Sequence, residues 1–270
     1  MGTINQTTIM NTVIVPVDFS ETSINAADYA AQLLAGREDL KVILFHLAET
    51  AEDAAVAPEK LDELVAKFYS EYHSQVEGVC LLGSNFIEQL EKQVKIYNAT
   101  LVIMGITSRS ELAQIFVSSN TLKLAETKVC PVLIVPETAK FTGIKSVMLA
   151  SDFKNVYYTT PVEPIKAFLK TFNPELHIVN VNSELYIALT EQHEKEKQAF
   201  IDHFGEFKPE FYFLRLYDIE ESITQFAEAK NIDLIITIQH EHPLLAKIFK
   251  SDHAKKLTFK SSLPVLVVHE

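Results

Sequence analysis

The sequence predicts an α/β protein built from two tandem units, each a doubly wound sheet of five parallel strands with helices on both faces. The first reason is that apolar runs of strand length alternate with segments whose apolar residues follow a helical period. Parallel strands need such crossover connections, which are right-handed. The second reason is an internal repeat: Pro131 and the four apolar residues after it recur at Pro264, 133 positions later.

The first unit opens with an apolar run that begins at Thr12 and ends at Asp18. Ser20 can then cap a helix whose small and apolar residues keep helical spacing up to Gly36. Further strands are expected at residues 41–47, 77–83, 101–104 and 130–136, and further helices at 58–75, from Ser84 or Asn85 to Tyr97, and between Ser118 and the last strand. Five strands therefore alternate with four helices.

The second unit repeats this order with less similarity. Asn98 recurs as Asn231 and Asp18-Phe19 recurs as Asp152-Phe153. Strands are expected at 146–150, 176–181, 211–214, 234–238 and 264–268, and helices at 157–172, interrupted by Pro161 and Pro164, at 188–204 and at 219–230. The polar stretch 137–143 marks the boundary. We therefore assign residues 1–140 to a first domain and 141–270 to a second, degenerate one.

Composition excludes several partners. The formal net charge of −12, from 36 acidic and 24 basic residues, argues against binding nucleic acid. No apolar run approaches the roughly 20 residues of a membrane span, and the N-terminus lacks a signal-peptide pattern. We expect a cytoplasmic protein with no membrane partner.

The two cysteines, Cys80 and Cys130, lie in or beside predicted strands. Two thiols form no disulfide framework in a chain of this size. A redox-active thiol would need an electropositive, exposed setting, which apolar neighbours do not provide. We expect both to be reduced and structural.

The opening Val-Ile-Val-Pro-Val-Asp-Phe-Ser, the Val-Ile-Leu-Phe-His-Leu strand and the segment from Met104-Gly105 to Cys-Pro-Val-Leu-Ile-Val-Pro together resemble the universal stress protein family. The resemblance covers nearly the whole chain as two copies. It implies the strand order 3-2-1-4-5 in each unit. It also implies a dimer formed through the last strands, here supplied internally as a pseudo-dimer, and it leaves a homodimer of the tandem chain open.

The ATP-binding members of that family carry the motif G-x2-G-x9-G-[ST] after strand four. Glycines there let the backbone approach phosphates, and the following helix contributes its N-terminal dipole. The matching residues here are Gly105, Ser108, Ser118 and Ser119, so one glycine of three remains. The resemblance implies ATP, with Mg²⁺, as the ligand of the first unit, at an affinity reduced by the two missing glycines.

The resemblance also implies which other residues form that site. Pro16, Val17 and Asp18 would lie beside adenine and ribose, Leu47 would line the adenine pocket, and Met104 and Asn120 complete the set. Alternatives stay open for several residues. Asp18 can instead accept backbone N–H bonds in a turn, Ser118 and Ser119 can cap a helix without a ligand, and Arg109 can be a solvated surface residue.

In the second unit the motif positions hold Ile238, Glu241, Ser251 and Asp252. Two carboxylates there would repel a nucleotide, so we expect no nucleotide in this unit. The neighbouring His240 and His242, with Glu241, form only a weak pattern for a metal, and we expect none.

The sequence favours a non-catalytic stress-response or signalling protein that binds ATP or a related nucleotide in its first domain. The alternative is an interaction protein of the same fold that has lost nucleotide binding. An enzyme is disfavoured because the chain has no Walker loop with lysine, no activated serine or cysteine motif and no pair of acids in an identifiable cleft.

Overall fold

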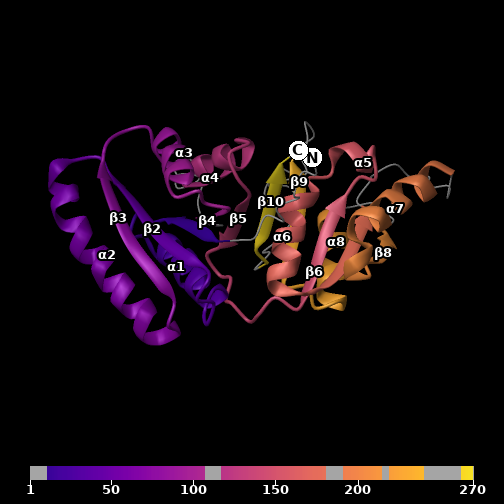
Figure 1. The fold of residues 1–270 in the computed structure, drawn as a ribbon, viewed down its shortest axis with the longest axis horizontal. Helices are drawn as coiled ribbons and strands as arrows, with labels where there is room; N and C mark the ends of the chain where they lie inside the picture. The colour runs from indigo at the N-terminus through magenta and orange to yellow at the C-terminus, as the bar shows by residue number, and fades with distance from the viewer. Residues whose placement is uncertain (1–10, 107–116, 181–190, 215–218, 240–262, 270) are drawn as a thin grey trace, which may run out of the picture. The chain divides into compact units, whose positions relative to one another are not determined.

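The computed structural model of the chain describes residues 11–106, 117–180, 191–214, 219–239 and 263–269. The chain divides into two compact units, one of which is Met10–Phe141 while the other includes Thr142–Glu270. Each unit is described by itself below (Figure 1).

The first unit is a five-stranded parallel sheet. Its strands follow the order β3-β2-β1-β4-β5, which confirms the order that the family resemblance implied. The elements in chain order are β1 Thr12–Pro16, α1 Glu21–Leu33, β2 Lys41–Ala48, α2 Ala51–Tyr72, β3 Gln75–Leu82, α3 Phe86–Ile96, β4 Leu101–Ile106, α4 Val117–Glu126 and β5 Val132–Pro136.

The inner strands β1, β2, β4 and β5 are almost wholly buried, whereas β3 is partly exposed. β1, β4 and β5 are near-continuous apolar runs, as expected where helices cover both sides of a parallel sheet. Helix α1 packs beside α2, and α3 packs beside α4 (Figure 1). The strand order changes direction at β1, so right-handed crossovers put these two pairs of helices on opposite faces.

The strands of the second unit have the same topology. Their order is β10-β9-β6-β7-β8, again with all described pairs parallel. The described elements are β6 Ser146–Ser151, α5 Val156–Thr159, α6 Val162–Phe172, β7 Glu175–Asn180, α7 Glu191–Phe204, β8 Glu210–Phe213, α8 Ile219–Ala229, β9 Leu234–Gln239 and β10 Val265–His269. Numbered within the unit this is the order 5-4-1-2-3, so the predicted tandem repeat is confirmed.

Backbone geometry explains why Asn98 recurs as Asn231. Both residues have positive φ, 48° and 49°, and lie two positions after the last residue of helices α3 and α8. The amide that follows each asparagine donates back into the preceding helix, Ala99 to Val94 O at 2.8 Å and Ile232 to Ala227 O at 2.9 Å. Asparagine tolerates this left-handed conformation better than most residues, so the repeat preserves a helix C-terminus.

One helix start differs from the sequence prediction. Helix α2 begins at Ala51 rather than near Pro58, because Thr50 Oγ1 accepts the Asp53 N–H at 3.1 Å and caps it seven residues earlier. Asn85 does occupy the N-cap position of α3, but its side chain makes no capping bond and donates to Glu88 Oε2 at 2.8 Å instead. The predicted Ser20 cap is present, since its Oγ accepts from Ser23 N at 3.2 Å.

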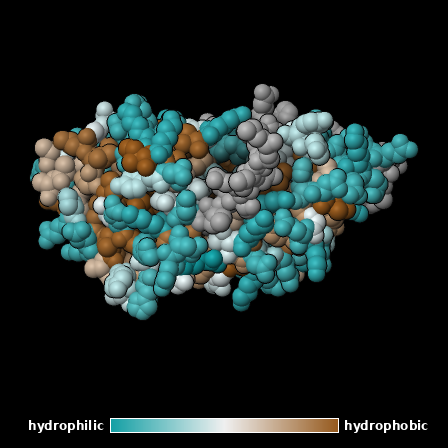
Figure 2. Space-filling view, viewed as in Figure 1, coloured by the Kyte–Doolittle hydropathy of each residue, from teal (hydrophilic) through white to brown (hydrophobic). Residues whose placement is uncertain are grey.

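The visible surface is mostly hydrophilic (Figure 2), in keeping with the net charge. Hydrophobic colour gathers over the part of the first unit that carries α2 and β3, where Leu82 is exposed. Within the described residues, the helices are all too short or too polar to cross a membrane.

Candidate functional site

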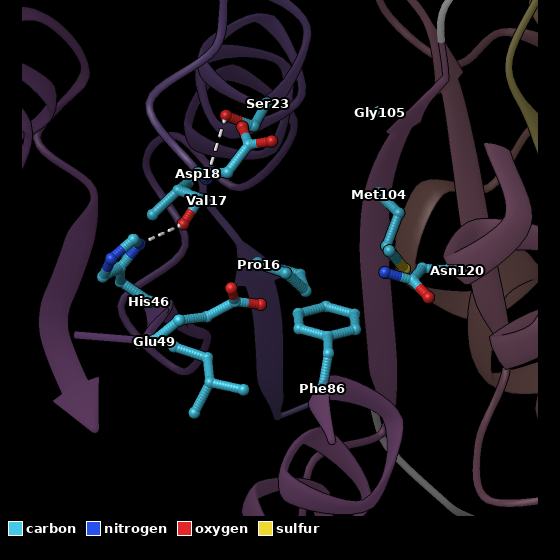
Figure 3. Close-up of a pocket in the computed structure, with 11 residues that line it drawn as sticks. Pro16, Val17, Asp18, Ser23, His46, Glu49, Phe86, Met104, Gly105 and Asn120 are labelled. Atoms are coloured by element: carbon cyan, nitrogen blue, oxygen red, sulfur yellow. Dashed lines mark hydrogen bonds between the residues drawn. The ribbon is translucent and has the colours of Figure 1, made fainter. Parts of the chain in front are cut away.

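A cavity of about 220 Å³ opens at the carboxyl ends of β1, β2 and β4 in the first unit (Figure 3). This edge, where the strand order reverses direction, is where ligands bind in doubly wound sheets. The lining is mostly apolar. It consists of Pro16, Val17, Asp18, Ser23, His46, Leu47, Glu49, Phe86, Met104, Gly105 and Asn120.

Seven of the ten residues predicted for the site lie around this one cavity. They are Pro16, Val17, Asp18, Leu47, Met104, Gly105 and Asn120. Ser118 and Ser119 lie in the first turn of α4, where the structure describes the backbone but not their side chains. Ser108 and Arg109 lie outside the described residues.

Four lining residues were not predicted from the sequence: Ser23, His46, Glu49 and Phe86. Glu49 directly follows β2, and Phe86 is the first residue of α3. Both therefore follow a strand at the carboxyl edge, a signal that was available from the predicted elements. His46 and Ser23 lie inside regular elements and gave no such signal.

Asp18 forms a tight turn with the start of α1. Its Oδ1 accepts from Ser20 N at 3.0 Å and from Ser20 Oγ at 2.6 Å. Its own N–H donates to Ser23 Oγ at 3.2 Å (Figure 3). Burial would raise the pKa of Asp18, but the serine hydrogen bonds outweigh it and lower that pKa. The alternative interpretation of Asp18 as a turn acceptor therefore describes what it does in this structure.

The same turn recurs in the second unit. Asp152 Oδ1 accepts from Lys154 N at 3.0 Å, and the phenylalanine between them has φ 56° where Phe19 has 61°. Positive φ is unusual for a bulky residue. It turns both rings into packing contacts, Phe19 with His46 at 4.8 Å and Phe153 with Phe200 at 5.0 Å between centroids. The Asp-Phe repeat thus encodes a backbone turn in both units.

His46 fixes the floor of the cavity. Its side chain is buried, with Nδ1 at 2.8 Å from Val17 O and Nε2 at 2.9 Å from Asp53 Oδ2. A carbonyl and a carboxylate both accept hydrogen bonds, so the pair holds the ring in place between two acceptors. The ring thereby positions the Val17 backbone, which lines the cavity.

Packing explains why residue 105 is a glycine, and the motif did not reveal this reason. A Cβ at this position would lie 2.6 Å from Thr22 O and 2.7 Å from Thr22 Cγ2, so only glycine lets β4 approach α1 this closely. Its carbonyl also accepts from Thr121 Oγ1 of α4 at 3.2 Å. Gly105 is therefore required for helix and strand packing, whatever the cavity binds.

The corresponding positions of the second unit differ in chemistry. The strand registers place Ile238, which is 5% exposed, where the first unit has Gly105, and Asn180 where it has His46. Glu241, Ser251, Asp252 and the histidines at 240 and 242 lie outside the described residues. In the parts of the chain that the structure describes, no group of three or more His, Cys, Asp or Glu side chains is placed to hold a metal.

At the opposite, amino edge of the second sheet, three side chains are arranged like a nucleophile, a base and an acid. His177 Nε2 lies 3.1 Å from Ser146 Oγ, and its Nδ1 lies 3.3 Å from Glu210 Oε2. Ser146 is only 6% exposed, however, and its hydroxyl donates to Lys230 O at 3.3 Å. A substrate carbonyl could not reach it, so we assign these contacts to folding.

This buried histidine makes stability depend on pH. Burial lowers the pKa of His177, against an opposing effect of Glu210. The folded state thus favours the neutral ring, and its contribution is complete above the ordinary pKa of about 6.5 and is lost as the pH falls below it. When the pH is lowered from 7.5 to 5.5, the denaturant midpoint of His177→Gln should therefore fall less than the midpoint of the wild type. An equal fall in both proteins would contradict this assignment.

Neither cysteine has the setting of a reactive thiol. Burial raises the pKa of Cys130 to about 12, and burial with a smaller effect of Asp53 raises that of Cys80. Both are free in the structure. Thiols with raised pKa values are poor nucleophiles at neutral pH.

The family model described as the universal stress protein family matches residues 10–136 and 168–269. A universal stress protein from Archaeoglobus fulgidus is similar in structure over 96% of this chain and 98% of its own, with a TM-score of 0.67 and 16% identity. A protein of unknown function from Pseudomonas aeruginosa is similar over 96% of this chain and 92% of its own, with a TM-score of 0.60 and 14% identity.

A universal stress protein solved in complex with cAMP is 22% identical over 48% of this chain and 99% of its own, but the TM-score of 0.39 carries no argument about this chain. Among curated proteins, no sequence matches. The structural likenesses show the fold, and the family model covers most of both units. The chain belongs to the universal stress protein family.

Proposed function

We propose that this chain is a cytoplasmic, non-catalytic protein of stress response or signalling whose first domain, residues 1–140, binds ATP or a related adenine nucleotide. The second domain, residues 141–270, supports it as the other half of an internal pseudo-dimer. The observation that carries the proposal is the cavity, around which the ends of three strands bring together residues that the family resemblance had assigned to the ligand.

The chemistry of the lining supports an adenine ligand. Leu47, Met104 and Phe86 offer apolar surface and an aromatic ring for a base, while Asp18 and Asn120 offer polar groups that fix orientation. Ser118 and Ser119, at the start of α4, would supply the contacts to the phosphates.

A specific observation favours the second candidate function, an interaction protein without a nucleotide. Two of the three motif glycines are serines, and the third is explained by its contact with Thr22. In that case the fold is retained while the ligand is lost.

Thermal unfolding of the purified full chain distinguishes the two. A ligand at about 100 times its Kd adds roughly 2.7 kcal/mol to the free energy of unfolding. We expect the melting temperature to rise with adenosine, AMP or ATP, each tested with and without Mg²⁺, and not to rise with guanosine. No shift with any adenine compound at millimolar concentration would favour the interaction protein.

A further inference from the structure

Residues 137–141 form a connector that leads from β5 toward the second unit, and helix α1 holds it. Asn25 of α1 makes the contacts: its Nδ2 donates to Pro136 O and to Ala139 O, both at 3.2 Å. Its Oδ1 accepts from Lys140 Nζ at 3.1 Å. An amide NH₂ group has two hydrogens to donate, and both are used here. The side chain of Asn25 therefore binds the start of the connector from three directions.

A ring contact adds to this anchor one turn further along α1. Tyr29, which is 3% exposed, meets Phe141 edge to face, with 5.3 Å between the ring centroids. Ala139 of the connector is 1% exposed. Segments that connect structural elements commonly run over the surface and move. The burial of Tyr29 and Ala139 shows instead that the connector is packed against the first unit.

The chain is held again soon after it enters the second unit. The backbone amides of Lys145 and Ser146 donate to Asp233 Oδ2 at 2.7 and 3.0 Å. Only residues 142–144 lie between the two anchored ends, and Gly143 among them has a φ of 104°, a conformation that favours glycine. A change in the connector is therefore separated from the start of β6 by three residues.

The helix that holds the connector also forms part of the cavity wall. Ser23, in the first turn of α1, lines the cavity and is two residues from Asn25 (Figure 3). Thr22 lies so close to β4 that a Cβ on Gly105 would be 2.6 Å from its backbone oxygen. Four alanines of α1 are completely buried. Such close packing prevents one part of the helix from shifting alone, so α1 moves as one body.

We infer that α1 couples the cavity to the connector, so that a ligand in the cavity and the anchoring of residues 137–141 stabilise each other. The inference rests on the proposed function and names how the same site is regulated. The connector has an anchored state, with the Asn25 contacts, and a released state without them. Anchoring fixes α1 where it forms the cavity wall, so the anchored state binds the ligand more tightly. The coupling is reciprocal, because the ligand stabilises the state that it prefers by the same factor.

Two measurements on the full chain test the inference, both with adenosine as the ligand. Hydrogen exchange of a peptide that covers residues 137–141 reports on release, because the Ala139 amide donates to Pro136 O in the anchored state. Saturating adenosine should slow this exchange about tenfold, within the roughly 5- to 150-fold range of such couplings. Calorimetry should show that Asn25→Ala, which releases the connector, binds adenosine more weakly by about the same factor. Equal factors are what a coupling between two states requires.

The matched control is Gln32→Ala. It truncates another amide side chain of α1, one whose Nε2 donates to Asp28 on the same helix and which does not line the cavity. It should change neither the exchange of the connector nor the affinity for adenosine. A second variant, Lys140→Ala, loosens the connector from its own side and leaves α1 intact. It should act in the same direction as Asn25→Ala with a smaller effect, and it decides the test if Asn25→Ala does not fold.

The remaining outcomes separate the inference from the proposed function. If adenosine binds but neither slows exchange in the connector nor loses affinity in Asn25→Ala or Lys140→Ala, the inference is overturned while the proposed function stands. An equal effect of Gln32→Ala would show a general loosening of α1 and would overturn the assignment to the connector. No binding of adenosine to the folded wild type overturns both the inference and the proposed function.

Discussion

Gly105→Ala is expected to lower the free energy of unfolding of the first unit by about 3 kcal/mol. The added Cβ would lie 2.6 Å from the backbone oxygen of Thr22, so α1 would have to move away from β4. Because the oxygen belongs to the backbone, no side-chain rotation can remove the clash. A packed helix such as α1 cannot shift without disturbing its other contacts, so the loss of stability is large. Urea denaturation followed by circular dichroism measures the loss.

Two controls identify the contact that is responsible. Gly83→Ala places its Cβ 3.5 Å from Leu47 Cδ1, an ordinary contact, and should change stability by less than about 1 kcal/mol. Adding Thr22→Ala to Gly105→Ala removes the methyl group but keeps the Thr22 carbonyl, so it should not restore stability. A full rescue would show that the methyl group, and not the backbone, is what excludes a side chain at Gly105.

His46→Ala is expected to cost a similar amount, about 3 kcal/mol. The variant leaves a cavity beside Phe19 and leaves the Val17 carbonyl without its donor. It should also weaken nucleotide binding, because Val17 then loses the contact that positions it. Denaturation and calorimetry on the same preparation measure the two effects.

A conservative variant tests the hydrogen-bonding role. His46→Asn introduces the residue that the second unit has at the equivalent position, Asn180, and keeps a donor for Val17 O. It should lose less stability than His46→Ala. Equal losses in both variants would mean that ring packing against Phe19 is what matters, and that the hydrogen bond to Val17 contributes little.

The sequence predicted the elements well wherever local rules and burial agree. Strands such as β4 and β5 are wholly apolar and bounded by polar residues, so their period and length were clear. The recurring Asn98 and Asn231 proved to be left-handed helix ends, which a single sequence shows only as an unexplained repeat. Helix α2 was predicted too short because Pro58 resembled a helix start, whereas the earlier Thr50 cap decides its beginning.

The site was predictable only in part, because the resemblance named residues by motif and not by their physical role. It named Gly105 as the residue that lets a phosphate approach, and the structure shows that Thr22 already requires a glycine there. It did not name Glu49, although the predicted elements already placed this residue just after a strand, at the carboxyl edge of the sheet. It did not name Ser23 or His46 either, because both lie inside regular elements and gave no such signal.

The most direct test of the proposed function is a methyl NMR titration of protein labelled at its methionines, using adenosine as the ligand. Met104 lines the cavity, whereas Met148 is fully buried in β6 of the second unit and serves as a control inside the same molecule. We predict that the Met104 methyl signal shifts with saturation while that of Met148 stays in place. An unchanged Met104 signal at saturating adenosine, or a shift confined to Met148, would contradict a nucleotide site in the first unit.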